Sequence, residues 1–145
     1  MKRILTIIIS FGLLVILAIP VSAQKFDYPS NKEKTFINED EFYQQLKKDE
    51  YKEYDNATYS IRRKIAYKEV PDAVMTFEKK TGRYMCQPKQ QLSPAIHPER
   101  QVYFYASFVQ THNEEYWKHA IIDAESKRQL EGGDSYHHYD NPYKK

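Results

Sequence analysis

Two aromatic-rich segments late in the chain constrain its fold more than any other feature. The first spans Val102–Gln110 and reads VYFYASFVQ, and the second spans Tyr116–Asp123 and reads YWKHAIID. Period-two alternation with many β-branched and aromatic residues is typical of β-strands, and the polar stretch THNEE between them is typical of a turn. We therefore expect these segments to pair as an antiparallel hairpin, which makes an antiparallel sheet the basis of the fold.

Both faces of this hairpin carry apolar or amphipathic side chains. Phe104 and Phe108 share one face of the first strand, whereas Tyr103 and Tyr105 share the other. Either helix and loop cover both faces, or an exposed aromatic surface binds a peptide, a glycan or a second copy of the chain. Tyrosine suits such a surface because its ring is apolar and its hydroxyl stays hydrated. The candidate binding residues are Tyr103, Tyr105, Tyr116, Trp117 and His119.

Residues 1–23 have the three-part pattern of a secretory signal peptide. Two basic residues precede an apolar run that ends at Ile19, and Pro20 and small residues then lead to Ala23. The run is shorter than the ~20 residues that a stable membrane span needs. We expect cleavage after Ala23, secretion of residues 24–145 and no stable membrane span after cleavage. An uncleaved N-terminal anchor is the alternative.

The charge balance and the cysteine count narrow the possible partners. The chain has 22 basic and 20 acidic residues, and because Lys2 and Arg3 belong to the signal peptide, the secreted part is balanced. A nucleic-acid partner requires a basic face, so we expect none. Cys86 is the only cysteine and therefore forms no internal disulfide. It is either a small buried side chain or an exposed thiol that pairs with another chain.

The sequence lacks the motifs of common catalytic and cofactor sites. It has no glycine-rich phosphate loop, no nucleophile elbow and no HExxH motif. We expect no cofactor, and we favour a protein without enzymatic activity. One alternative is a wall-associated hydrolase with a carboxylate site under the proline-rich loop Gln87–Gln101. Another is a metal site, with His112, His137 and His138 as weak candidate ligands, since adjacent histidines on an extended segment point to opposite sides.

The first half of the secreted chain predicts a lead-in and one or two helices. Residues 24–38 read as an extended lead-in, and Asn38 then caps a helix that runs from about Glu39 to Tyr54. Thr58–Val70 alternates like a strand but is rich in helix-forming Ala, Arg and Lys, so we favour a helix. Pro71 ends this element in either case.

The remaining residues predict short strands. The stretch AVMTFEKKTGRYMC, residues 73–86, reads as two strands that turn at Gly82, and Gln129–Gly133 reads as a short last strand. Residues 134–145 form a tail rich in Tyr and His. The sequence therefore predicts a single α+β domain over residues 39–133, with one or two N-terminal helices packed on a four- to five-stranded antiparallel sheet.

Two segments resemble PepSY-type secreted modules. They read SIRRKIAYKEVPDAVMTFEKKTGRYM and HAIIDAESKRQL, and the resemblance covers about half of the secreted chain. It implies a helix at Ile61–Val70, a closing hairpin at Ile121–Leu130 and a non-enzymatic, often protease-inhibitory or regulatory, role. Lys127-Arg128 replaces the glycine that is usual in the final turn. A cystatin-like arrangement of helix on sheet fits the same elements.

These features favour a small secreted, non-enzymatic binding or regulatory domain of a bacterium. It would act as a protease-regulating or cell-wall-associated module, and its partner would be a protein or a cell-wall glycan. The aromatic hairpin face would make the contact. The sequence leaves the identity of the partner and the oligomeric state open.

Overall fold

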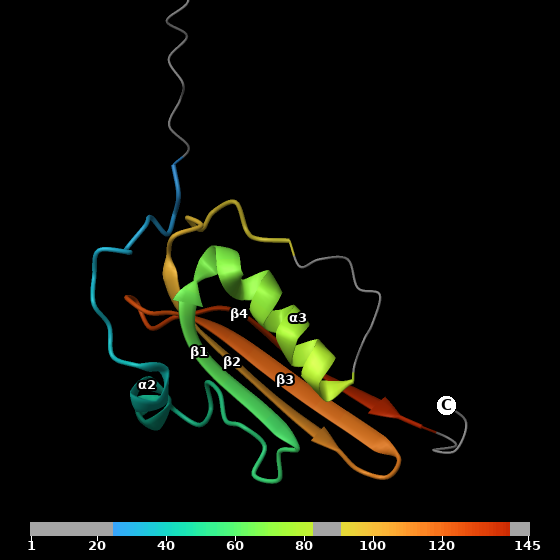
Figure 1. Cartoon of the computed structure of the whole chain (residues 1–145). Coiled ribbons are helices and arrows are strands. Elements are labelled where there is room, and N and C mark those ends of the chain that lie inside the picture. The colour runs from blue at the N-terminus through green and yellow to red at the C-terminus, as the bar shows by residue number, and fades with distance from the viewer. Residues whose placement is uncertain (1–24, 83–90, 140–145) are drawn as a thin grey trace, which may run out of the picture.

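The computed structural model describes residues 25–82 and 91–139, and the predicted signal peptide lies outside these ranges (Figure 1). Four strands form one antiparallel sheet in the order β1-β2-β3-β4, which confirms the predicted α+β class and the antiparallel sheet. Along the chain the elements are α2 (Glu39–Gln45), β1 (Tyr59–Ala66), the 3-10 turn η1 (Tyr67–Glu69), α3 (Val70–Thr81), β2 (Gln101–Gln110), β3 (Glu114–Asp123) and β4 (Gln129–His138).

The position of the helices differs from the prediction. α2 precedes every strand, whereas α3 is inserted between β1 and β2, so the helices are not both N-terminal to the sheet. Figure 1 shows α3 lying along one face of the sheet, and α2 lies beside β1. Within residues 25–82 and 91–139, every helix is too short or too polar to span a membrane.

The central hairpin has the predicted pairing. β2 and β3 run antiparallel from Val102 opposite Asp123 to Gln110 opposite Glu115, and a short turn joins them. Val102–Val109 is buried throughout, so this strand lies in the interior of the molecule on both faces. A strand that is covered on both sides needs apolar or hydrogen-bonded side chains at every position, and this explains its unusual composition.

The predicted helix at Thr58–Val70 is wrong, because β1 occupies most of this segment. Each residue of β1 is paired with β2, from Tyr59 opposite Phe108 to Ala66 opposite Gln101. Helix propensities differ by less than about 1 kcal/mol among Ala, Arg, Lys and Ile. Burying one isoleucine side chain stabilises a fold by roughly 1.5–3 kcal/mol. Burial of Ile61 against the core therefore outweighs local helix preference.

The two strands predicted around Gly82 are also wrong where the structure describes them. Val70–Thr81 is a helix whose buried residues Val70, Ala73 and Phe77 are spaced by three and four positions. Pro71 lies in the first turn, where a missing N–H costs nothing, so the proline begins a helix rather than ending one. Gly82 has a φ of 70° and closes the helix by donating its N–H to Glu78.

The first helix is shorter than predicted. The predicted N-cap is confirmed, because the Asn38 side chain accepts a hydrogen bond from Glu41 N at 2.8 Å. However, α2 ends at Gln45 instead of Tyr54. Phe42 and Tyr51 lie nine positions apart, and at about 100° per residue they would face opposite sides of one continuous helix. Both side chains pack on the same face of the sheet, so the helix must end between them.

The last strand is longer than predicted. β4 runs to His138, so residues 134–138, which the sequence assigned to a tail, pair with β3. The turn before β4 contains Lys127 at a φ of 59°, in the left-handed region that glycine normally occupies. Lys127 N donates to Asp123 O at 2.9 Å, which closes the turn.

Each face of the sheet is covered by a separate buried cluster. On one face, α3 packs through Val70, Ala73 and Phe77 on a cluster that includes Phe104 and Phe108. On the other face, Phe42 and Tyr51 pack on Tyr103 and Tyr105 of β2 and on Ala120 and Ile122 of β3. The residues that cover this second face all precede β1 in the chain.

Candidate functional site

The five predicted binding residues do not form one surface. Trp117 lies opposite Phe108 in the sheet and His119 lies opposite Ala106, so both face α3. Tyr103, Tyr105 and Tyr116 face the opposite side. The alternation in the sequence does assign each residue to the correct face, but it gives no information about what covers that face.

Tyr103 and Tyr105 are buried beneath the segment that precedes β1. Their rings are nearly parallel, with centroids 6.2 Å apart, and Phe42 stacks on Tyr103 at 4.1 Å. Each hydroxyl donates a 2.8 Å hydrogen bond to a main-chain carbonyl, Tyr103 to Ile37 and Tyr105 to Glu39. Burial raises the pKa of both hydroxyls, so they remain neutral donors. For Tyr103 and Tyr105, the first of the two alternatives holds: helix and loop cover this face of the hairpin.

Trp117 and His119 form a stacked pair on the other face. Their ring centroids are 4.8 Å apart at an interplanar angle of 16°, and Trp117 lies 6.5 Å from the ring of Phe77 in α3. His119 Nδ1 is buried and has no hydrogen-bond partner in the described structure. Burial lowers the pKa of His119, because the loss of water disfavours the charged imidazolium. This imidazole is therefore suited to packing and not to proton transfer at neutral pH.

An accessible aromatic surface does exist at the end of the sheet where β3 begins and β4 ends. We define it as the tyrosine patch, which consists of Tyr54, Tyr116 and Tyr136. Tyr116 lies opposite Tyr136 in the sheet with ring centroids 4.8 Å apart, and Tyr54 lies 6.4 Å from Tyr116. Tyr136 is 55% exposed, which is high for a large aromatic side chain. Of these residues, the sequence prediction included Tyr116 alone.

A single carboxylate orders the tyrosine patch. The hydroxyls of Tyr116 and Tyr136 donate to the two oxygens of Glu114, each at 3.1 Å. Burial and then the hydrogen bond to Glu114 raise the pKa of both hydroxyls. On the other side of the patch, Lys118 Nζ lies 4.1 Å from the centroid of the Tyr54 ring. The tyrosine patch thus combines ordered rings with one acidic side chain, Glu114, and one basic side chain, Lys118.

The histidines do not converge. His137 and His138 lie on β4 opposite Glu115 and Glu114, and they point to opposite faces of the strand. His138 Nδ1 is 3.8 Å from Glu114, and His112 lies in the turn between β2 and β3. Among the described residues, no three His, Cys, Asp or Glu side chains are placed to hold a metal ion. Cys86 lies outside the described residues.

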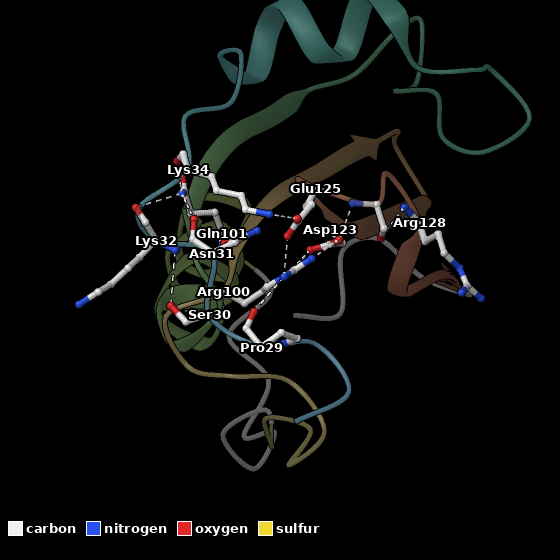
Figure 2. A network of polar contacts seen from close by, with 11 residues as sticks. Pro29, Ser30, Asn31, Lys32, Lys34, Arg100, Gln101, Asp123, Glu125 and Arg128 are labelled. Atoms are coloured by element: carbon white, nitrogen blue, oxygen red, sulfur yellow. Dashed lines mark hydrogen bonds and ion pairs between the residues drawn. The ribbon is translucent and has the colours of Figure 1, made fainter. Parts of the chain in front are cut away.

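A buried ion pair lies at the opposite end of the sheet (Figure 2). Arg100 Nε and Nη2 donate to the two oxygens of Asp123 at 2.6 and 2.8 Å, and Asp123 is fully buried. The Arg100 side chain also reaches Pro29 O and the Glu125 carboxylate, each at 2.8 Å. These contacts join the segment before α2 to the ends of β2 and β3.

The ionisation of Asp123 follows from its partners. Burial by itself raises the pKa of Asp123, but the hydrogen bonds from Arg100 and Ser126 outweigh burial and lower it. The same contact with Asp123 raises the pKa of Arg100. The pair is therefore charged at neutral pH, and Asp123 cannot act there as a proton donor. The geometry of the Arg100–Asp123 pair is that of a structural anchor. The sequence analysis also offered a carboxylate site under the loop Gln87–Gln101, and part of this loop lies outside the described residues.

Comparison of the chain with protein-family models, with curated proteins and with solved structures gives no match.

Proposed function

We propose that this protein is a small secreted, non-enzymatic binding domain that contacts a protein partner through the tyrosine patch. The observation that carries the proposal is the exposed ring of Tyr136, which is held against Tyr116 with both hydroxyls on Glu114. A large aromatic side chain that is ordered before binding loses little conformational entropy when a partner covers it.

The chemistry of the patch favours a protein over other partners. Protein interfaces are enriched in tyrosine at the centre and carry polar groups at the rim. Here the rings of Tyr54, Tyr116 and Tyr136 form the centre, and Glu114 and Lys118 lie beside them. The signal-peptide pattern of residues 1–23 supports a partner outside the cytoplasm.

The proposal is tested by photo-crosslinking in the cells that produce the protein. A photoreactive residue replaces Tyr136 in one variant and Met75 in a control, because Met75 is equally exposed on α3. We expect a defined protein adduct from position 136 alone. Tyr136→Ala should then weaken binding of the purified partner by about tenfold, whereas Met75→Ala should leave it unchanged. Equal adducts at both positions, or binding of wall glycan alone, would contradict the proposal.

A further inference from the structure

The two edges of the sheet are protected to different degrees. β1 forms one edge and carries three successive basic residues, Arg62, Arg63 and Lys64. Basic side chains on an edge strand oppose the addition of a further strand. β4 forms the other edge, and its ten residues include no Lys, Arg or Pro. Among residues 25–82 and 91–139, β3 is the only strand that pairs with β4. The edge of β4 therefore lacks the protection that β1 has.

The main chain of β4 presents hydrogen-bonding groups along this edge. Tyr139 N donates to Asn113 O at 2.8 Å, so the main chain of Tyr139 is directed towards the strand beside it. Along an antiparallel strand this direction alternates from one residue to the next. Because the register with β3 is regular here, Asp134, Tyr136 and His138 direct their N–H and C=O groups away from β3. All three residues are exposed, so a further strand has access to these groups.

A second copy of β4 complements the first in one antiparallel register. A two-fold axis at Tyr136 places Tyr136 opposite Tyr136 of the second copy, and Asp134 opposite His138 of the second copy. An imidazole N–H donates well to a carboxylate, whereas a register centred on Asp134 would bring two carboxylates together. The residues that meet in the first register are also those whose main-chain groups point outward. One register therefore satisfies both the main chain and the side chains.

The same register continues the side-chain rows that already cross β3 and β4. Tyr136 lies opposite Tyr116 within the chain, and both rings lie on the sheet face opposite α3. The tyrosine patches of the two copies would therefore form one continuous row. On each side of it, a second row would alternate between basic and acidic side chains: Lys118 and Asp134 of one copy, followed by His138 and Glu114 of the other.

From these observations we propose that the protein partner of the tyrosine patch is a second copy of this chain. The two β4 strands pair antiparallel across a two-fold axis at Tyr136 and join the two sheets into one. Such an interface uses the same residues of both copies, which is the usual symmetry of a homodimer. In strand addition, main-chain hydrogen bonds supply affinity and side chains supply specificity. The inference rests on the proposed function, because it names the partner of the same patch.

The mass of the secreted chain in solution tests the association. Sedimentation should give a mass that rises towards twice that of one chain between about 1 µM and about 1 mM. Tyr136→Lys places like charges opposite each other at the axis and should weaken association at least about tenfold. Met75→Lys adds the same charge at an exposed position of α3 and should leave association unchanged. A parent chain that stays monomeric, or equal weakening by both variants, overturns the proposal.

Disulfide formation between copies tests the register and keeps the tyrosine rings. In chains that carry Cys86→Ser, one variant adds Ser135→Cys and another adds His137→Cys. In the proposed register these positions face each other as a non-hydrogen-bonded pair, with Cα atoms about 4.5 Å apart, which suits a disulfide. We expect a disulfide-linked dimer in the mixture of the two variants and in neither variant alone. A disulfide in Ser135→Cys alone, or none in the mixture, overturns the register.

The failure of this inference is distinguishable from the failure of the proposed function. A photoreactive group at position 136 should give an adduct with the mass of two chains, and that result supports both. If position 136 captures a different protein while the purified chain stays monomeric, the second copy is excluded and the proposed function stands. If position 136 gives no protein adduct, both fail.

Discussion

Tyr51 and Tyr105 stack on each other, yet their hydroxyls have opposite hydrogen-bonding states. Tyr105 donates to Glu39 O, whereas the buried Tyr51 hydroxyl has no partner among the described residues. A lost hydrogen bond costs about 1 kcal/mol, and removal of an unpaired buried hydroxyl relieves a desolvation penalty. We expect Tyr105→Phe to lower the free energy of unfolding by about 1 kcal/mol and Tyr51→Phe to leave it unchanged or raise it. Urea unfolding measures both, and equal losses would contradict this account.

His119 gives the stability a pH dependence of known sign. Burial holds its pKa below 6.5 in the folded state, so the unfolded chain takes up the proton first as the pH falls. The free energy of unfolding should therefore decrease as the pH falls below about 6.5. In His119→Phe, which retains an aromatic ring beside Trp117, this decrease should be smaller. Thermal melts between about pH 7.5 and 5, a range that brackets the ordinary imidazole pKa of about 6.5, check this. His137→Ala, an exposed control, should behave like the parent chain.

At the scale of elements, the turn between β3 and β4 contains a strained residue. Lys127 adopts a φ of 59°, which costs a residue with a Cβ roughly 1 kcal/mol relative to glycine. Lys127→Gly should therefore raise the free energy of unfolding by about 0.5–1 kcal/mol. Lys127→Ala keeps the strain and should give no gain. Chemical unfolding of both variants makes the comparison, and a gain in Lys127→Ala would show that the lysine charge, and not the backbone, causes the effect.

The elements that were predicted correctly are those whose sequence pattern is compatible with only one type of secondary structure. The β2–β3 hairpin alternates over its whole length, and the Asn38 cap precedes three acids. Gly82 was predicted as a turn residue, and its positive φ suits a hairpin turn and a helix C-cap equally well. β1 depends on pairing with β2, which begins 35 positions after β1 ends, and local helix propensity does not report that pairing. The tyrosine patch was missed for the same reason, since Tyr136 joins Tyr116 only through the β3–β4 register.

At the scale of the whole molecule, the Arg100–Asp123 pair connects the segment before α2 with the ends of β2 and β3. Asp123→Asn leaves Arg100 buried without its counter-charge, and we expect the free energy of unfolding at pH 7 to fall by about 3–5 kcal/mol. Because the pKa of Asp123 is lowered in the folded state, the pair stabilises the fold above about pH 3.9 and loses its effect as the pH falls further. The difference between the parent chain and Asp123→Asn should therefore shrink in acid.

Denaturant titrations at several pH values measure this difference. Glu33→Gln is the matched control, because the Glu33 side chain is 89% exposed and its contact with Lys32 is long. Its stability should equal that of the parent chain at every pH. A constant gap between the parent chain and Asp123→Asn from neutral to acid pH would show that shape, and not charge, makes Asp123 stabilising.

Residues 25–54 are synthesised before the strands on which their side chains pack. Phe42 and Tyr51 cannot pack until β2 and β3 are synthesised, because the tyrosine and alanine side chains on which they pack come from those strands. Contacts between residues so far apart in the chain form slowly. During that interval the chain already contains the residues of α3, but Phe42 and Tyr51 lack the side chains on which they pack. Phe42 and Tyr51 can therefore reach their packed positions only after β2 and β3 have been made.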